Sequence, residues 1–530
     1  MAFFLQTKFH VDDVKKINAA LITYNSKYSI KLFINDKECY TADSELISSE
    51  TYSSKNGLLN EIDIYESWAA KKRFLKKEDF ASLLRNGENT LTLMVYNLNK
   101  LKSLQLNKIS FWVLENNTIR FPQFQNPAFM KNRKDVFEES TVPVLKINTF
   151  NQVIPDDPKA TSSLSIIEKN EDLKEYAIKI EKRGYTSQSF AKKSYGFTIY
   201  KNYKPNKEKL LHLPAAKKWI LYGPYADKSL IRNSLTYSLY EKMGYYAPRS
   251  KCVELIINDN YQGLYWLMEK INIGKNHLNI PKLVVDSIGN AKGGYLLEMG
   301  RFIWKSNFPL KGDSTSSIFY YDISSPNKDS LPAPVIYKIQ NQLYLLEKSL
   351  YYQQDIFKHI DINSFIDFFI INEFTKNDDA YRMSTYFYNK DISSETPKFF
   401  MGPVWDFNFA YGLTHIGSSP EGFIYNSSKH IPVWWKTLIN NPVFFEKLQT
   451  RYTELRKTTL SAKSINNTID SLTQICKSPS ERNFKKWNVL GSDDLWPNYY
   501  VGKTYEEEID YLKLWINKRL IFLDGKLKKW

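Results

Sequence analysis

Two acidic motifs stand out in the second half of this 530-residue chain. The first, NDDAYRMSTYFY, begins at Asn377, and the second, KFFMGPVWDFNFAYG, ends at Gly412. Each follows or contains an apolar segment, so each places a carboxylate at the end of a packed element. In Mg-dependent phosphoryl transfer, one carboxylate accepts or orients the proton of the nucleophile and another holds the metal on the phosphates. The pattern therefore predicts an ATP-dependent kinase of an unusual type.

Several common site signatures are absent from the sequence. It has no G-x-x-x-x-G-K-[ST], G-x-G-x-x-G, H-E-x-x-H or G-x-S-x-G motif, so no ordinary glycine-rich loop is expected to hold ATP. The six histidines show no ligand spacing. Any metal is therefore expected to be held by oxygen, which favours Mg or Mn.

Composition indicates a folded protein with a large core, since 43% of the residues are hydrophobic and 15% are aromatic. The formal charge of +16 would suit acidic partners, but the lysines are scattered singly, so we expect a solvated surface and no nucleic-acid groove. No apolar run approaches the ~20 residues that span a bilayer. The first residues lack a basic region and an export h-region, so no signal peptide is expected in this chain.

The three cysteines, Cys39, Cys252 and Cys476, lie far apart in the sequence and form no Cys-x-x-Cys motif. The spacing therefore implies neither a disulfide framework nor a zinc site.

Residues 1–135 read as an accessory domain of β structure. Segments 28–36 and 89–97 are rich in β-branched and apolar residues and are bounded by turn formers, as strands are. We expect a small antiparallel sandwich or jelly roll that binds carbohydrate or serves as a spacer. Residues 121–140 contain two prolines and no sustained period, which is typical of a linker.

The second predicted domain, residues 136–530, begins with strands and ends with helices. Strands are expected at 141–150, 176–184, 192–200, 217–224 and 293–300, with a hairpin across residues 258–260. A helix is expected from about Asp227 to Met243, with Asp227 as its N-cap. From about residue 333 the pattern becomes helical, and a buried helix at 361–374 leads directly to Asn377.

At this point several motifs together resemble a known family. EKRGYTSQSFAKKSYGFTIY, WILYGPYADKSLIRNSLTYSLYEKMGYYAPRS, VELIINDNYQGLYWLMEKI, NEFTKNDDAYRMSTYFYNK and MGPVWDFNFAYG, in this order, are similar to the CotH kinase family of bacterial proteins. The resemblance extends to PVWWKTL, RNFKKWNVLG and TYEEEIDYLKLW, so it covers about residues 140–530. It implies an α+β chain in which a β-sandwich precedes an atypical two-lobed protein-kinase-like domain with a helical C-terminal portion.

The resemblance also implies an activity and its residues. Family members transfer the γ-phosphoryl group of ATP to Ser or Thr hydroxyls of spore coat or secreted proteins, so a secreted or cell-envelope location is expected. The family's catalytic aspartate, in an Asn-x-Asp motif, falls on Asp379 after Asn377. Arg382, next to this acidic loop, could bind phosphate or hold Asp379 in place. The family's metal-binding aspartate falls on Asp406. Many members carry a second acid two places on, where this chain has Asn408, a weaker ligand for Mg.

Without a glycine-rich loop, the phosphates of ATP need Lys or Arg donors. Basic residues in the matching segments are Arg183, Lys193, Lys228, Arg232 and Lys270. Lys193 is preferred to Lys192 because only one of two consecutive strand residues can face a cleft. Lys228 and Arg232, four apart, would share one face at the start of the predicted helix, where the helix dipole favours anions. A pair of ordinary surface charges is the alternative.

Adenine needs an apolar slot with a backbone donor and acceptor. Met268 and Glu269, at the end of a predicted strand, are expected to supply those backbone contacts. By the resemblance, an aromatic residue shortly before the metal aspartate stacks on the base, which is Phe400 or its neighbour Phe399 here. Packing in the core is the alternative role for these rings.

Two other functions stay open on the sequence. The chain could be a non-catalytic surface or coat assembly protein with a glycan-binding N-terminal module. It could also be a polysaccharide hydrolase that uses Asp379 and Asp406 as acid and base. The hydrolase would not explain the basic residues in the same segments.

Overall fold

The computed structural model describes most of the second predicted domain and only strands of the first. It describes residues 140–528 except 151, 170, 172, 203, 301–319, 428–430, 433 and 493–496. Before residue 140 it describes residues 3–11, 17–24, 29–35, 37–42, 71–76, 83, 87–96, 110–115 and 118–120. The predicted linker at 121–140 therefore lies almost entirely outside the described residues.

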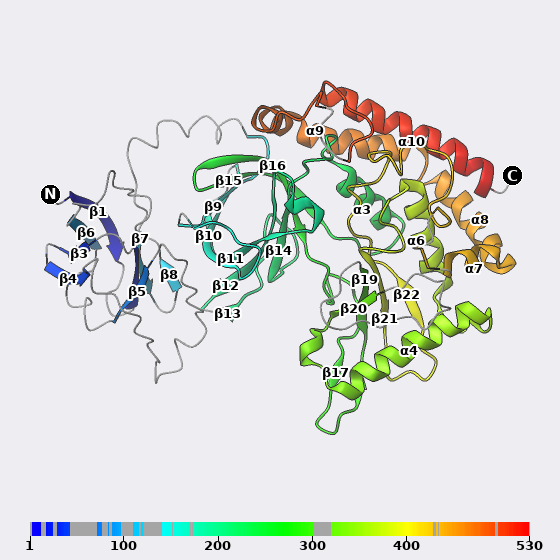
Figure 1. Cartoon of the computed structure of the whole chain (residues 1–530), viewed down its shortest axis with the longest axis horizontal. Coiled ribbons are helices and arrows are strands. Elements are labelled where there is room, and N and C mark those ends of the chain that lie inside the picture. The colour runs from blue at the N-terminus through cyan, green and yellow to red at the C-terminus, as the bar shows by residue number, and fades with distance from the viewer. Residues whose placement is uncertain are drawn as a thin grey trace.

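The N-terminal strands form two four-stranded antiparallel sheets (Figure 1, blue). The first has the order β1 (Phe3–Val11), β6 (Gly87–Tyr96), β3 (Ser29–Ile34) and β4 (Lys37–Ala42). The second has the order β5 (Lys71–Lys76), β2 (Ile17–Tyr24), β7 (Ser110–Glu115) and β8 (Thr118–Arg120). The strands predicted at 28–36 and 89–97 are confirmed as β3 and β6. Their packing as a sandwich stays a prediction.

The next sheet is mixed and closes on itself. Its strands are β9 (Val144–Asn148), β10 (Ala160–Ile167), β11 (Lys174–Arg183), β12 (Ser194–Lys201), β13 (Lys204–Pro205), β14 (Lys218–Tyr222), β15 (Ser250–Ile257) and β16 (Asn260–Glu269). They run in the order β11-β10-β9-β15-β16-β14-β12-β13, and β11 also pairs with β12. This second pairing closes the sheet into a barrel.

Alternating side chains explain why the barrel has its own core. Along β10, buried and half-buried residues alternate in the period of two that a strand imposes. On β15, Val253 and Leu255 point into the barrel core with Leu145 and Phe197. The hairpin predicted at 258–260 is confirmed: β15 pairs with β16, and Asn258 and Asp259 both have positive φ, as tight hairpin turns require.

The helix predicted from Asp227 to Met243 begins later than expected. Helix α3 spans Arg232–Lys242, because Asp227 instead accepts hydrogen bonds from the backbone N–H groups of Ser229 and Arg232 in a non-helical turn. The expectation that Lys228 and Arg232 share one helix face is therefore wrong, since Lys228 precedes the helix.

A second sheet and several helices make up the rest of the chain. The sheet has the order β20 (Tyr320–Ser325), β19 (Tyr295–Gly300), β21 (Thr385–Asn389) and β22 (Phe399–Met401). A short ribbon joins β17 (Val284–Val285) to β18 (Ala291–Lys292). The helices are α4 (Ala333–Tyr352), α5 (Ile356–His359), α6 (Ile362–Thr375), α7 (Trp434–Asn440), α8 (Pro442–Lys457), α9 (Ala462–Lys486) and α10 (Tyr505–Leu527). The predicted α+β class and the buried helix at 361–374 are confirmed.

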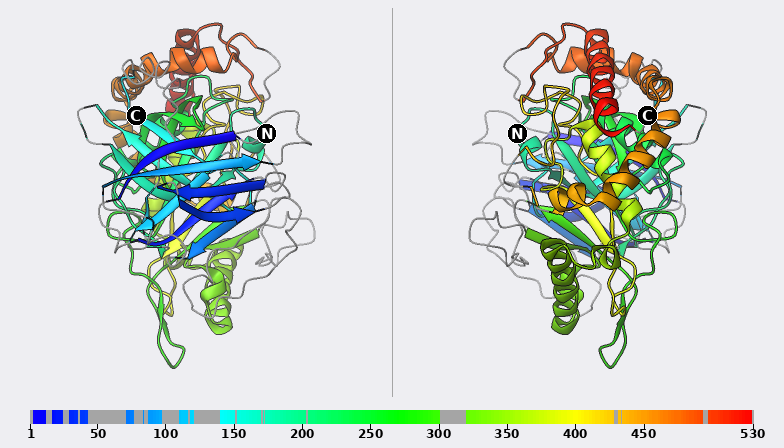
Figure 2. Two further views of the ribbon diagram at one scale, coloured as in Figure 1. Left: turned by 90° about the vertical axis from the view of Figure 1, so that its left-hand side faces the viewer. Right: turned by 90° about the vertical axis from the view of Figure 1, so that its right-hand side faces the viewer.

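The helical part has a core separate from that of the barrel. Helix α6 is buried along most of its length, and Asp361 caps it by accepting a hydrogen bond from the backbone N–H of Ser364 at 2.9 Å. Helix α9 packs on β15 and β16 of the barrel and also contacts α3 and α10. Helices α8 and α10 lie at the end of the molecule away from the N-terminal strands (Figure 2). No helix among the described residues is long and apolar enough to cross a membrane.

A buried ion pair ties the C-terminal helix to the end of α6. The side chains of Glu373 and Arg519 are fully buried, and Arg519 Nη2 lies 3.4 Å from Glu373 Oε2. Arg519 also donates to the carbonyl of Glu373, and Glu373 accepts from the backbone N–H groups of Ile424 and Tyr425, each at 2.8 Å. Helix α10 thereby fixes where α6 ends.

We expect Arg519→Met to lower the free energy of unfolding by about 3–5 kcal/mol, because it leaves the Glu373 carboxylate buried without its cation. Guanidinium unfolding followed by circular dichroism measures the change. Lys518→Met, at the exposed neighbouring position, should alter stability by less than about 0.5 kcal/mol. Equal losses in the two variants would contradict the role of the ion pair.

Candidate active site

The loop after α6 brings the first acidic motif together. Helix α6 ends with Lys376 in the left-handed conformation, at φ 47°, and the chain then turns. The Asn377 side-chain oxygen accepts a hydrogen bond from the backbone N–H of Asp379 at 3.3 Å. Arg382 donates to the carbonyl of Asp378 at 2.7 Å and lies 3.5 Å from Asp379 Oδ1. Asn377, Asp379 and Arg382 thus share one turn.

The second acidic motif places Asp406 five residues after β22, in a left-handed conformation at φ 63°. Its backbone N–H donates to the Tyr237 hydroxyl of α3 at 3.1 Å. Its Oδ2 accepts a hydrogen bond from the Ser384 hydroxyl at 3.3 Å, and Ser384 belongs to the loop after α6. Trp405 stacks on the ring of Tyr237, with ring centroids 6.2 Å apart. Helix α3 therefore fixes the backbone of this motif.

Backbone hydrogen bonds hold the two acidic motifs side by side. The N–H of Tyr411 donates to the carbonyl of Thr375 at 2.7 Å, and the N–H of Asp378 donates to the carbonyl of Phe409 at 3.4 Å. Together with the hydrogen bond from Ser384 to Asp406, these bonds join the loop after α6 to residues 406–411. Two motifs that are separated in sequence by a hairpin therefore converge in space.

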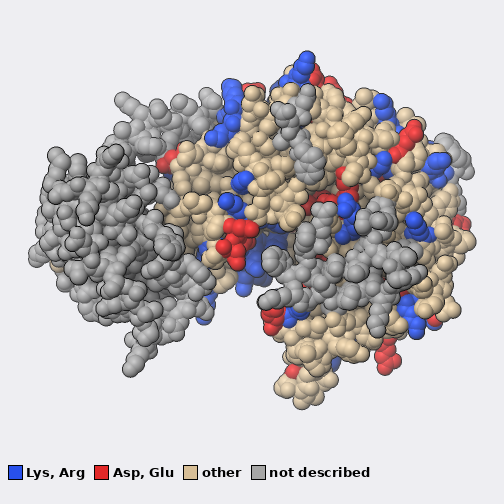
Figure 3. Space-filling model, in the orientation of Figure 1, with Lys and Arg blue, Asp and Glu red and all other residues tan. Residues whose placement is uncertain are grey.

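Arg183 of the barrel contacts the Asp406 segment, and Lys270 lies near Arg183. The Arg183 guanidinium, at the end of β11, lies 5.5 Å from the centre of the Trp405 ring. Lys270 directly follows β16. Desolvation by nearby protein atoms lowers the pKa of Lys270 to about 8, and the positive charges of Arg183 and Lys218 lower it further. The residue is nevertheless exposed at the surface. Figure 3 shows a hollow between the barrel and the helical part, with Lys and Arg side chains inside it.

Sequence reasoning missed Glu298 and Tyr386, which belong to the same neighbourhood. They face each other in the ladder between β19 and β21. Burial raises the pKa of Glu298, while a hydrogen bond with Tyr386 and the charges of Lys270 and Arg183 oppose the rise. The signal was available in GGYLLEMG, where a single acid stands in an otherwise apolar strand, but the sequence did not show which face it occupied.

The Asp406 carboxylate has properties that suit a metal ligand. Burial raises its pKa, and the Arg183 charge and the Ser384 hydroxyl oppose this rise. Among the described residues no Lys or Arg forms an ion pair with it within 4.0 Å. A divalent cation would compensate a partly buried carboxylate of this kind, and carboxylate and amide oxygens are the donors that Mg prefers. Asp406 therefore suits the predicted Mg site, and the half-buried Asn408 stays a predicted second ligand.

Comparison with known proteins identifies the family. The sequence model of a family described as CotH kinase protein matches residues 180–523, which is more than half of the chain and includes both acidic motifs. This chain belongs to that family. The resemblance seen in the sequence motifs is confirmed.

A curated relative of this CotH family member is the inner spore coat protein H of Bacillus subtilis (strain 168). The two are 21% identical over 304 residues, covering 56% of this chain and 70% of the relative. Among solved structures, a β-D-glucuronidase for Dictyoglomus thermophilum matches at 9% identity and TM-score 0.12, covering 46% of each chain. A glycosyl hydrolase family 2 member from Bacteroides cellulosilyticus matches at 11% identity and TM-score 0.15, covering 48% of this chain and 34% of the other. These TM-scores are too low to indicate a shared fold, and this chain spans less than half of either structure.

Two of the predicted phosphate ligands of this CotH chain lie in its core. Lys228 is fully buried and donates to the carbonyl of Ser492 at 3.3 Å. Arg232 is also fully buried; its Nη1 lies 2.5 Å from Asp227 Oδ1 and its Nε donates to the carbonyl of Ala410 at 3.1 Å. Through its hydrogen bond to Ala410, Arg232 holds the backbone of the segment that follows Asp406. A direct contact of either residue with phosphate stays a prediction.

The two consecutive lysines before β12 have different environments. Lys192 is buried, and its ammonium donates to the carbonyl of Leu264 at 2.6 Å and to the Asn483 side chain at 2.7 Å. Lys193 is half-buried and donates to the carbonyls of Gln188 and Phe190. It therefore folds back on its own loop, and a phosphate contact would require it to leave those carbonyls.

The residues predicted to contact adenine are occupied by other interactions. Strand β16 lies between β15 and β14, so Met268 has ladder partners on both sides. The N–H of Glu269 donates to the carbonyl of Arg249 at 3.1 Å, and its carboxylate forms an ion pair with the Arg249 guanidinium at 2.9 Å. The ring of Phe400 stacks on Tyr388, with centroids 5.2 Å apart. The adenine contacts predicted for Met268, Glu269 and Phe400 stay predictions.

The described residues contain one cluster with metal-ligand spacing, formed by Glu168 and Glu171 of the β10–β11 connection and His212 of the segment before β14. The Lys174 ammonium already forms ion pairs with both glutamates. The cluster includes none of the predicted site residues, and we assign no metal to it.

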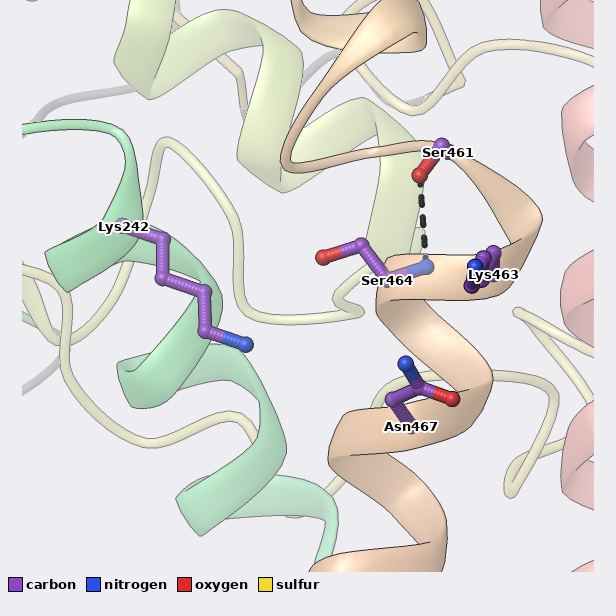
Figure 4. Close-up of a pocket in the computed structure, with 5 residues that line it drawn as sticks. All are labelled: Lys242, Ser461, Lys463, Ser464 and Asn467. Atoms are coloured by element: carbon purple, nitrogen blue, oxygen red, sulfur yellow. Dashed lines mark hydrogen bonds between the residues drawn. The ribbon is translucent and has the colours of Figure 1, made fainter.

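A cavity of about 260 Å³ lies away from the acidic motifs (Figure 4). Lys242, at the end of α3, faces the first turn of α9, where the Ser461 hydroxyl accepts the N–H of Ser464 at 3.2 Å. Lys463 and Asn467 complete the lining. None of these residues was predicted to function in the site, and the Lys242 ammonium already donates to the Thr468 hydroxyl at 2.7 Å.

Asp378, next to the predicted catalytic Asp379, is the buried acid of the loop. Its Oδ2 accepts a hydrogen bond from the Thr414 hydroxyl, and its Oδ1 is buried with no partner among the described residues. Burial raises the pKa of Asp378 to about 6, while Thr414, Arg382 and Lys376 oppose the rise. The Asp378 side chain therefore points into the protein.

We expect Asp378→Asn to stabilise the protein at pH 7.5 by about 3 kcal/mol, since the folded state then no longer buries a charge. The pKa of Asp378 is higher in the folded chain than its ordinary value of 3.8, so the parent loses stability as pH rises from about 4 to about 6. The gain should disappear near pH 4. Urea unfolding across this range measures it, with Asp510→Asn at an exposed position as control. A parent that gains stability relative to the variant with rising pH would contradict the assignment.

Proposed function

We propose that this chain is an atypical protein kinase that transfers the γ-phosphoryl group of ATP to Ser or Thr hydroxyls of a protein. The observation that carries the proposal is the convergence of two acidic loops beside Arg183 and Lys270. The family description, CotH kinase protein, supports the same reaction class.

In the proposed reaction, Asp379 orients the acceptor hydroxyl and takes its proton. The hydroxyl oxygen forms a bond to the γ-phosphorus while the bond from that phosphorus to the bridging oxygen breaks, so ADP leaves and a phosphoprotein forms. Asn377 and Arg382 position Asp379, because one accepts from its backbone N–H and the other lies 3.5 Å from its carboxylate.

Asp406, with Asn408 as a second ligand, would hold the Mg or Mn ion that comes with ATP. The ion would neutralise phosphate charge during transfer. Arg183 and Lys270 would contact phosphate oxygens from the barrel side, because Arg183 acts on both Asp406 and Glu298, Lys270 acts on Glu298, and neither is locked in an ion pair among the described residues.

The proposed architecture follows from the same arrangement. The barrel and the helical part would act as two lobes that enclose the nucleotide, with residues 136–530 as the kinase-like domain. The two N-terminal sheets would form a β-sandwich domain over residues 1–135 that binds carbohydrate. A coat or cell-envelope location is proposed from the name of the spore coat relative.

Transfer of labelled γ-phosphate in the presence of Mg or Mn tests the roles of the two acids. We expect Asp379→Asn and Asp406→Asn each to reduce autophosphorylation and labelling of casein at least ~100-fold, because each removes a group that acts in the transition state. Asp510→Asn, an exposed aspartate on α10, should keep the parent rate.

A thermal shift with MgATP separates binding from chemistry. The parent and Asp379→Asn should both melt at higher temperature with MgATP, whereas Asp406→Asn should lose most of this rise.

Equal labelling by the parent and both site variants would refute the roles given to these acids. The absence of any MgATP-dependent rise in the parent would favour a non-catalytic scaffold.

A further inference from the structure

Two cysteines that are 224 residues apart in sequence touch inside the folded chain. The sulfur atoms of Cys252 on β15 and Cys476 on α9 are 4.0 Å apart, and both residues are buried. Sequence spacing gave no reason to pair them. A disulfide needs sulfur atoms about 2.05 Å apart, so the two would have to approach by only about 2 Å.

The two cysteines lie on elements that are locked together at neighbouring positions. Two residues along β15 from Cys252, the fully buried Glu254 carboxylate accepts two hydrogen bonds from the Arg482 guanidinium of α9, each at 2.7 Å. Asn483 of α9 accepts a hydrogen bond from the N–H of Leu264 on β16 at 3.2 Å. The register of α9 on the barrel is therefore fixed by polar contacts on the same stretch of helix.

Strand alternation turns Cys252 towards α9. Its neighbour Val253 belongs to the barrel core, whereas Cys252 belongs to the same hydrophobic core as Cys476. A one-residue shift in β15 would point Cys252 into the barrel. Because the strand is paired on both sides, with β9 and β16, that shift is blocked.

A buried lysine accompanies the pair, and burial lowers its pKa well below the usual value. The Lys192 ammonium is held by the carbonyl of Leu264 and the side chain of Asn483. Burial raises the pKa of the Cys252 thiol, and the Lys192 charge acts against this rise. Exchange in the folded state should therefore be slow, and the bond would form most readily while the chain folds.

We infer that Cys252 and Cys476 form a disulfide that links the barrel to α9 when the chain folds under oxidising conditions. The two thiols lose two protons and two electrons as one S–S bond forms. With oxidised glutathione as oxidant, its own disulfide takes up the electrons and is broken into two thiols. The inference does not depend on the proposed kinase activity.

Refolding of the full chain tests the link, with Cys39→Ser as the parent so that two thiols remain. After refolding with oxidised and reduced glutathione, we expect the thiol count in denaturant to fall from two to none. A non-reducing peptide map should contain one species that joins the peptides of Cys252 and Cys476. The oxidised protein should melt about 5 °C above the form kept in dithiothreitol, because the link closes a very long loop.

Variants and alternative outcomes make the test decisive. Cys252→Ser and Cys476→Ala, each made in the Cys39→Ser parent, should show no difference in melting temperature between the two buffers. Two free thiols, two glutathione adducts or a cross-link between chains in the parent would overturn the inference. An intramolecular link that lowers the melting temperature would also overturn it, because the native geometry would then not accommodate the bond. The thiol count in the parent decides the question even if a variant fails to fold.

Discussion

The site depends on how the short segment 407–411 is held. Its backbone is fixed from two sides: the N–H of Phe407 donates to the Asn233 side chain of α3 at 2.6 Å, and the N–H of Tyr411 donates to the carbonyl of Thr375 at the end of α6 at 2.7 Å. Between them Arg232 donates to the carbonyl of Ala410. Because Asp406 directly precedes this segment, its direction is set by two helices that are far apart in sequence. On the proposed function, these contacts preorganise the Asp406 segment for electrostatic catalysis.

Buried ion pairs lie at the helix ends that hold this segment. A buried ion pair stabilises a fold little compared with apolar packing, because both charges lose their hydration, but it permits only the arrangement in which they meet. Arg232 with Asp227 fixes the start of α3, and Arg519 with Glu373 fixes the end of α6. The two pairs therefore specify geometry at the two helix ends that carry the site, which we offer as the reason for burying charge there.

Local features were predictable from the sequence and long-range ones were not. The buried helix at 361–374, its following acidic loop and the 258–260 hairpin depend on apolar periodicity and turn residues within a few positions, and the structure confirms these elements. Closure of the barrel depends on the pairing of β11 with β12 and on β10, which the sequence analysis did not identify. The burial of Lys228 depends on residues near 492, and the contact of Cys252 with Cys476 depends on how α9 docks. No spacing rule carries information over such separations. The roles of the candidate site residues stay predictions.

The electrostatics around Asp406 and Glu298 favour a ligand that brings both signs of charge. Burial raises the pKa of Asp406 and of Glu298, so each carboxylate is incompletely compensated, while the pKa of Lys270 is lowered in part by other cations. An anion alone would be attracted by the cations of the site but repelled by its carboxylates, and a cation alone would be attracted by the carboxylates but repelled by the cations. A phosphate chain with a divalent ion would compensate both kinds of charge, because its negative oxygens can pair with Arg183 and Lys270 while its cation pairs with Asp406. On the proposed function, the site should therefore bind the metal–nucleotide complex more tightly than either component alone.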